Sequence, residues 1–224
     1  MTSAVKDTLA VVLAHGKAAD IVARHLPFWQ EQAREVVFFT PTDDVLPGTY
    51  WQYGIGKSKA YSADTNQRCR SALRFASFVQ AKYTLLFEYD SIILGDIPNK
   101  YLPPAGGVSA PVFHDHTPGK KFLGDTYLHF PQMYTRTGLQ KVVQAMDALP
   151  ADAEGGFTDR YVGLAVARSG VPVLDLNLTG FVYTQNEIDE PKLPAAVEAY
   201  RKGARWSHGI KTEKVLKALQ EAAK

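Results

Sequence analysis

The sequence LAVVLA at residues 9–14 is a short apolar run with two β-branched valines at its centre, and His15 and Gly16 follow it at once. A run of this length that ends at a glycine is typical of a buried strand. Working outward, residues 17–33 carry apolar side chains at helical spacing, with Pro27 expected to shorten the helix. Residues 35–40 (EVVFFT) are a second apolar, β-branched run. We therefore expect a strand, a helix and a second strand.

The same alternation continues further along the chain. Residues 41–44 predict a turn, residues 45–61 a long loop rich in glycine and aromatic residues, residues 62–80 a helix with one apolar face, and residues 83–87 (YTLLF) a third buried strand. Strands that alternate with helices in this way predict an α/β fold with a Rossmann-type, mainly parallel sheet flanked by helices.

The second half of the chain has less regular signals. Strands are expected over residues 107–113, 127–133 and 171–176. Helices are expected from a Thr137 cap onward, from a Thr158 cap to Gly170, after Pro194, and over residues 211–224, with an interruption at residues 203–209.

Length and composition fit one soluble domain. The chain has 224 residues, of which 46% are hydrophobic and 21% charged, and no linker divides it. The net charge of +2 gives little support to nucleic-acid binding, and the single cysteine, Cys69, allows no internal disulfide. No apolar run reaches the roughly 18 residues that span a bilayer. We expect a cytoplasmic protein, at most attached to a membrane surface, without a transmembrane segment.

The most informative residues for function follow the third strand. Glu88 and Asp90 are separated only by Tyr89, and carboxylates two positions apart point to the same side of an extended chain. Open α/β sheets bind ligands at the carboxyl ends of their strands. A carboxylate pair there suits Mg²⁺ or Mn²⁺ that also holds a diphosphate. The alternative interpretation is a polar strand end that faces water.

Two later segments carry further candidate residues. His208, in the run WSHGIK, offers an imidazole to a transition metal, and Lys211 is a candidate contact for a phosphate. Asp159, in the run GGFTDRYVG, is expected in the first turn of a helix. There it serves as a general base or simply complements the helix dipole.

These three segments, in their order along the chain, resemble those of the nucleotide-diphospho-sugar glycosyltransferases of the GT-A fold. In that family an acidic Asp-X-Asp motif follows a buried strand, and here the motif reads Glu88-Tyr-Asp90. An acid four residues before a glycine matches Asp159 and Gly163, and a late metal-binding histidine matches His208. The resemblance extends from residue 9 to residue 211. In compact size the chain is also similar to small transferases of large algal viruses and of bacterial surface-polysaccharide clusters.

The resemblance implies a single GT-A-like domain over residues 1–224, with a nucleotide-binding half of about residues 1–100 and an acceptor-binding half of about residues 101–224. It implies a hexosyl- or deoxyhexosyltransferase of polysaccharide biosynthesis. Such an enzyme moves a sugar from a nucleotide sugar, here a UDP-sugar, to a hydroxyl of a glycan or glycoconjugate acceptor, with inversion. Asp159 would be the catalytic base, Asp90 and His208 would hold Mn²⁺ or Mg²⁺, and Glu88 would contact the metal or bind ribose.

The nucleotide sugar is expected to lie over the first strands. The expected contacts are His15 and Gly16 after the first strand, Thr40 and Asp43 after the second, Lys57 in the glycine-rich loop, Arg70 and Arg74 on the helix before the acidic motif, Glu88 and Tyr89 in that motif, and Lys211. For Arg70 and Arg74 the alternative interpretation is that they lie on a helix face exposed to water.

Two other classes of function stay open at this point. His114 and His116 stand at strand spacing and, joined by Asp125 or His129, would suit a metal-dependent hydrolase. The alternative is a polar loop, since a proline and a glycine follow closely. A non-catalytic sugar-nucleotide-binding domain would instead use the aromatic residues expected at the surface, which are Tyr50, Trp51, Tyr53 and Trp206.

Overall fold

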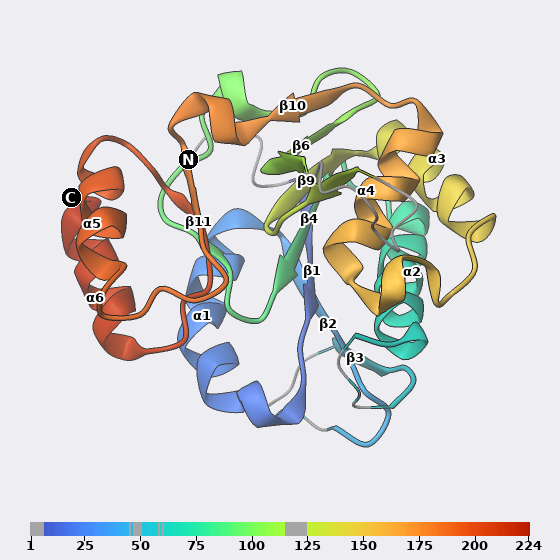
Figure 1. The fold of residues 1–224 in the computed structure, drawn as a ribbon, viewed down its shortest axis with the longest axis horizontal. Helices are drawn as coiled ribbons and strands as arrows, with labels where there is room; N and C mark the ends of the chain where they lie inside the picture. The colour runs from blue at the N-terminus through green and yellow to red at the C-terminus, as the bar shows by residue number, and fades with distance from the viewer. Residues whose placement is uncertain (1–6, 45, 47–50, 58, 60, 115–124) are drawn as a thin grey trace.

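The structure is a computed structural model that describes residues 7–44, 46, 51–57, 59, 61–114 and 125–224. It confirms the predicted α/β class, because a mainly parallel sheet of seven strands has helices packed on both faces (Figure 1). In spatial order the strands are β10 (Val173–Asp175), β6 (Val108–Ala110), β9 (Gln132–Thr135), β4 (Tyr83–Glu88), β1 (Thr8–Leu13), β2 (Glu35–Thr40) and β3 (Trp51–Gly54).

The pairing of the strands decides which loops meet. β1 lies between β2 and β4 and is parallel to both, with Leu13 beside Phe39 on one side and Glu88 on the other. The pairs β2–β3 and β6–β10 are also parallel, whereas β9 runs antiparallel to β4 and β6. The carboxyl ends of β1, β2 and β4 therefore share one edge, which is where open α/β sheets bind ligands.

Side chains of β1 alternate between two cores. Leu9, Val11 and Leu13 face the core that includes α2, α3 and α4, while Ala10 and Val12 face the core that includes α1. A strand covered on both faces needs apolar residues at every position, which explains the unbroken apolar run. The helices are α1 (Ala19–Gln32), α2 (Ala63–Phe78), α3 (Arg136–Asp147), α4 (Thr158–Ser169), α5 (Leu193–Arg201) and α6 (Glu213–Ala222).

Two smaller sheets complete the fold. A three-stranded sheet in the order β11 (Val182–Thr184), β12 (Trp206–His208) and β5 (Ile92–Ile93) lies on the α1 side of the molecule, and α5 and α6 pack there as well (Figure 1). A two-stranded hairpin pairs β7 (Val112–His114) with β8 (Thr126–Leu128).

Three strand predictions were wrong in detail. The loop expected over residues 45–61 contains β3, a strand at the sheet edge whose mixed polar and aromatic residues give no clear alternation. The strands expected over residues 107–113 and 127–133 are each two strands, divided at Pro111 and Pro131, because proline has no N–H to donate to a sheet.

Helix boundaries also differ from those expected. Pro27 lies inside α1 and does not shorten it. The N-cap of α3 is Thr135 rather than Thr137, since the Thr135 Oγ1 accepts a hydrogen bond of 3.1 Å from the Gly138 N–H. Thr158 is the first residue of α4 rather than its cap, while Gly170 ends α4 in the left-handed conformation as expected.

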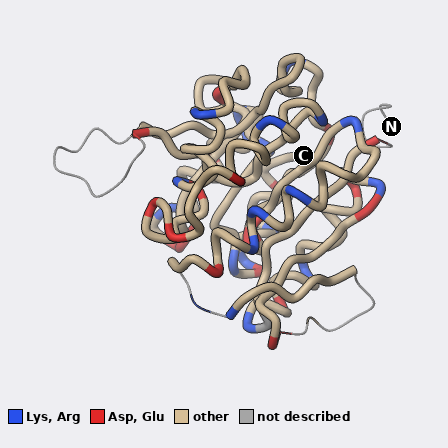
Figure 2. Tube along the Cα trace, turned by 90° about the vertical axis from the view of Figure 1, so that its right-hand side faces the viewer, with Lys and Arg blue, Asp and Glu red and all other residues tan. Residues whose placement is uncertain are grey.

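The surface of the described chain carries mixed charge. Basic and acidic residues are interspersed along the tube in Figure 2, in keeping with the small net charge of +2. None of the helices in the described ranges has both the length and the apolar character that crossing a membrane requires.

Candidate active site

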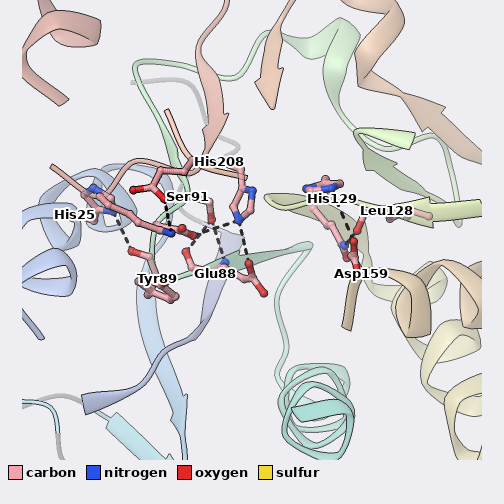
Figure 3. A network of polar contacts seen from close by, with 12 residues as sticks. His25, Glu88, Tyr89, Ser91, Leu128, His129, Asp159 and His208 are labelled. Atoms are coloured by element: carbon pink, nitrogen blue, oxygen red, sulfur yellow. Dashed lines mark hydrogen bonds and ion pairs between the residues drawn. The ribbon is translucent and has the colours of Figure 1, made fainter. Parts of the chain in front are cut away.

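Glu88, Asp90 and His208 meet at the carboxyl edge of the central sheet (Figure 3). One ligand atom from each lies within 4.8 Å of the others. The Nε2 atom of His208 is 3.0 Å from Glu88 Oε2 and 3.2 Å from Asp90 Oδ1. The Asp90 and His208 side chains are 4% and 8% exposed, whereas Glu88 is 30% exposed. The fold thus brings together three side chains that the sequence analysis placed in one metal site, and Glu88 forms its open side.

A tight turn after β4 presents the acidic pair. The Ser91 hydroxyl donates to the Glu88 carbonyl oxygen at 2.8 Å and accepts from the Glu88 N–H at 3.0 Å. The Ile210 N–H donates to the Asp90 carbonyl oxygen at 2.8 Å, which ties the segment after β12 to this turn. The acidic pair and the histidine strand are therefore connected through backbone as well as through side chains.

The alternation of β12 directs His208 toward the acidic pair. Trp206 lies fully buried in the core on the α1 face of the central sheet, with its Nε1–H donating to the Pro131 carbonyl at 2.8 Å. Ser207 points the other way and hydrogen-bonds Tyr200 on α5. Because side chains two apart share a face, His208 follows Trp206 toward the central sheet. The expectation that Trp206 lies at the surface was wrong for the same reason.

Three side chains on one face of helix α1 hydrogen-bond the turn after β4 and the segment that follows it. His25 Nδ1 lies 3.0 Å from the Tyr89 carbonyl oxygen, to which it donates because a carbonyl only accepts. Trp29 Nε1–H donates to the Ser91 carbonyl at 2.9 Å, and Gln32 donates to Gly95 at 2.8 Å. Sequence analysis missed His25 and Gln32, although their spacing of seven residues with Trp29 between them follows the helix period.

Gly209 has a structural reason to follow His208. Its φ is +86°, which favours glycine, and a Cβ there would lie 2.5 Å from the Gln185 carbonyl oxygen. The Ile188 N–H donates to the Gly209 carbonyl at 2.9 Å. The loop around residue 187 therefore packs directly on the backbone beside the histidine.

The electrostatics of the cluster fit a cation. Burial by itself lowers the pKa of His208, but its close contacts with the carboxylates of Asp90 and Glu88 outweigh the effect of burial and raise the pKa to about 10. The single Nε2–H donates to Glu88, and the buried Asp90 Oδ1 has no hydrogen-bond partner among the described residues. A divalent cation such as Mn²⁺ or Mg²⁺ would satisfy both carboxylates at once, so this donor set fits a metal.

Asp159 lies beside this cluster, in the first turn of α4. Its Oδ2 is 3.8 Å from His129 Nε2, and the His129 ring centroid is 5.4 Å from that of His208 (Figure 3). Burial raises the pKa of Asp159, the Arg160 N–H opposes that change, and the charge of Glu88 adds to it. Asp159 Oδ1 accepts the Arg160 N–H at 2.9 Å in the first turn of the helix, while Oδ2 faces His129.

Gly163, the glycine of the matched motif, serves helix packing. A Cβ at this position would lie 2.4 Å from the Thr126 carbonyl oxygen. Glycine therefore lets α4 approach β8 closely, and this contact brings Asp159 to the edge of the hairpin.

His15, Gly16 and Tyr89 lie where the nucleotide was expected. His15 follows β1, and its ring stands edge-on to Tyr89 with centroids 4.6 Å apart. Burial lowers the pKa of His15, and the charges of Asp44, Arg68 and Asp90 act on the same ring. Gly16 begins a short 3₁₀ helix over Gly16–Ala18. His15 therefore lies against the turn that carries the acidic pair.

The structure places the expected residues after β2 differently. Thr40 is fully buried, and its hydroxyl donates to the Asp44 carbonyl at 3.2 Å and accepts from Gln52 at 3.0 Å. Asp43 is exposed, whereas the charge of its neighbour Asp44 acts on His15. The Thr40 hydroxyl is therefore used within the turn, and Asp44 is the residue of this segment whose charge acts on His15.

On α2, Arg68 binds carbonyl oxygens of the loop before the helix and its charge acts on His15, whereas Arg70 and Arg74 contact other helices. Arg74 pairs with Asp147 on α3, and Arg70 lies beside the Tyr161 hydroxyl on α4. Arg68 is 8% exposed, and its charge acts on His15. The sequence signal was its position one helical turn before the buried Ala72, which puts residue 68 on the inner side of the helix.

The two expected lysines are more exposed to solvent than the side chains of the cluster. Lys57 is exposed, and its carbonyl oxygen accepts from Arg68 Nη2 at 3.0 Å. Lys211 Nζ is 3.4 Å from Glu187 Oε2, and the charge of Glu187 in turn acts on Tyr89. A bound phosphate would have to draw Lys211 from that carboxylate.

The structure describes only some of the residues named for the two alternative functions. His114 is exposed and lies 3.2 Å from Thr126 Oγ1, and His116 falls outside the described residues. His129 contacts Asp159 instead, and within the described ranges the three-residue cluster is the one group of three or more side chains placed to bind a metal. Of the aromatic residues for a binding domain, Trp51 and Tyr53 are 72% and 40% exposed, and Tyr50 lies outside the described ranges.

The buried His25 makes the fold sensitive to acid. Burial lowers its pKa to about 4, against an ordinary value of 6.5, and the hydrogen bond to Tyr89 opposes that change. As the pH falls, the unfolded chain binds the proton at His25 before the folded chain does. The contribution of neutral His25 to the free energy of unfolding is therefore fully present above pH 6.5 and is lost between pH 6.5 and about 4. The expected loss of unfolding free energy from this group is about 3 kcal/mol.

His25→Asn should flatten this pH dependence, because asparagine keeps a donor near the Nδ1 position and does not titrate. Urea unfolding of both proteins with EDTA at pH 7, 6, 5 and 4 would measure it. The difference between the two curves isolates His25 from other titrating groups, and parallel curves would refute the prediction.

Comparison with known proteins adds no relative: the sequence matches no protein-family model and no curated protein.

Proposed function

We propose that this protein is a metal-dependent glycosyltransferase that moves a sugar from a nucleotide sugar, a UDP-sugar, to a hydroxyl group of a glycan acceptor. The observation that carries the proposal is the cluster of Glu88, Asp90 and His208 at the carboxyl edge of a parallel sheet, with Asp159 beside it. A cation site at this edge suits a diphosphate, and the order of these residues is what the sequence resemblance rests on.

The chemistry follows from the placement of charge. Asp90 and His208 would hold the cation, which when bound supplies positive charge opposite the departing diphosphate. The charge of Arg68 acts on His15, which follows β1, and these two residues would contact the nucleotide. Asp159 would take the proton from the acceptor hydroxyl as that oxygen attacks the sugar carbon, and its raised pKa makes it a stronger base. Attack assisted by this base inverts the sugar configuration.

A thermal-shift comparison tests the proposal on the wild-type protein. A ligand that binds only the folded state at 100 times its Kd stabilises it by about 2.7 kcal/mol, which for a chain of this size raises the Tm by about 5–10 °C. We expect this shift with UDP plus Mn²⁺ or Mg²⁺, and a much smaller one with UDP and EDTA. Absence of a metal-dependent shift with any nucleoside diphosphate or nucleotide sugar would refute the proposed function.

A further inference from the structure

Tyr61 combines an exposed ring with an unfavourable backbone conformation. Its side chain is 67% exposed, and its φ is +50°. In the described ranges only one other non-glycine residue, Glu154, has a positive φ. A bulky residue is rare in this region, and such conformations concentrate at functional sites because the surrounding structure must hold them in place.

Close packing holds Tyr61 in this conformation. The Tyr61–Ser62 backbone lies directly against Gly156, where a Cβ would be 2.3 Å from the Tyr61 carbonyl carbon and 2.2 Å from the Ser62 nitrogen. The Tyr61 ring lies over Phe157, with centroids 4.5 Å apart and the planes 32° from parallel. One side of the ring thus rests on Phe157, while most of the side chain stays open to solvent.

Tyr61 lies beside the start of α4, the helix that carries the proposed base. Phe157, under its ring, is the N-cap residue of α4 and stands two residues before Asp159. Asp159 Oδ2 in turn lies 3.8 Å from His129 Nε2, and the His129 ring centroid is 5.4 Å from that of His208. A ligand against the open ring of Tyr61 would therefore lie on the Asp159 side of the candidate active site.

We propose that Tyr61 is a stacking platform for a pyranose ring on the Asp159 side of the candidate active site. The inference rests on the proposed function and names the sugar subsite within it. Saccharides bind aromatic faces through their C–H groups, which needs an exposed ring held rigidly in place. Stability alone does not explain the residue, because glycine would relieve the positive φ and an exposed ring buries little apolar surface.

Three variants separate stacking from structure. Tyr61→Phe keeps the ring, Tyr61→Ala removes it, and Tyr61→Gly removes it while also relieving the backbone. Phe78→Ala is the matched control, because Phe78 is similarly exposed at 78% but ends α2 before β4 begins, whereas the candidate site follows the carboxyl end of β4.

The probes are UDP, a panel of UDP-hexoses, and a panel of methyl hexopyranosides. Calorimetry with Mn²⁺ measures the nucleotides, and saturation-transfer-difference NMR in the presence of UDP and Mn²⁺ measures the glycosides. We expect Tyr61→Ala and Tyr61→Gly to weaken saccharide binding by about tenfold, with Tyr61→Phe and Phe78→Ala close to wild type. The Tm of Tyr61→Gly should be no lower than that of the wild type, and affinity for UDP itself should not change.

The two arms distinguish which sugar is bound. A loss confined to UDP-hexoses assigns the platform to the donor sugar, and a loss confined to methyl glycosides assigns it to the acceptor. Wild-type saccharide affinity in the alanine and glycine variants would overturn the inference, and so would a wild-type protein that binds no saccharide in either arm. If the wild type binds no UDP with Mn²⁺ but still binds glycosides through Tyr61, the proposed function fails and the platform stands.

Discussion

Replacing Asp90 by asparagine should remove metal-dependent nucleotide binding. Asp90 is 4% exposed, and its Oδ1 lies 3.2 Å from His208 Nε2 without a hydrogen-bond partner in the described part of the chain. Asparagine keeps the shape but carries no negative charge, so it cannot balance a buried cation. Loss of partners that merely orient a ligand already costs metal affinity about 10–100-fold, and we expect loss of a ligand to cost at least about 100-fold.

Isothermal calorimetry of UDP with and without Mn²⁺ measures this effect. Asp96→Asn is the matched control, since Asp96 is an exposed aspartate on the same segment and should bind as the wild type does. Direct titration of Mn²⁺ alone gives a second readout that does not depend on the nucleotide. Unchanged affinity for UDP and Mn²⁺ in Asp90→Asn would mean that Asp90 and His208 form only a buried ion pair.

Replacing Asp159 by asparagine should abolish turnover and leave nucleotide binding intact. Asp159 Oδ2 faces His129, and the charge of Glu88 acts on it, but the carboxylate is not part of the cluster that would hold a metal. Removing a general base costs a rate factor of about 10²–10⁴. The amide keeps the acceptor atom for the Arg160 N–H, so the helix end should survive the change.

Release of UDP from a nucleotide sugar measures turnover, and calorimetry measures affinity. Asp152→Asn, an exposed aspartate shortly before α4, is the control. Because burial raises the pKa of Asp159, kcat/KM of the wild type should fall as the pH drops through that raised pKa, and this acidic limb should be absent from the residual activity of Asp159→Asn. Full turnover in the variant would leave Asp159 with the role of complementing the helix dipole.

The strands and helices of the first half could be predicted because their signals are local. β1, β2 and β4 are covered on both faces over most of their length, so each is a largely apolar run. β3 could not be recognised in this way, since it lies at the sheet edge with Gln52 and Gly54 among aromatic residues. Its parallel pairing with β2 depends on a neighbour rather than on its own composition.

Some residues of the candidate site could likewise be recognised from local sequence, whereas others depend on how the elements pack. Asp90 could be chosen because an acidic pair directly follows a buried strand, and Asp159 because it opens a helix. The choice between Arg68, Arg70 and Arg74 depends on a rotation of α2 that its neighbours set. The contact of His25 with the turn could not be predicted from the sequence, because its partner is a backbone carbonyl oxygen, which every residue has.

By itself the sequence determined the α/β alternation and which short segments carry carboxylates and imidazole, because apolar periodicity and residue chemistry act over a few neighbouring positions. The resemblance implied that His208 joins the acidic pair, but only the tertiary structure shows the contact of His208 with Glu88 across 120 residues of sequence and the packing of Tyr61 over Phe157. The physical reason is that such meetings depend on how separate elements pack. β12 turns one face to the central sheet, Gly209 admits a neighbouring loop, and Gly156 admits the backbone of Tyr61.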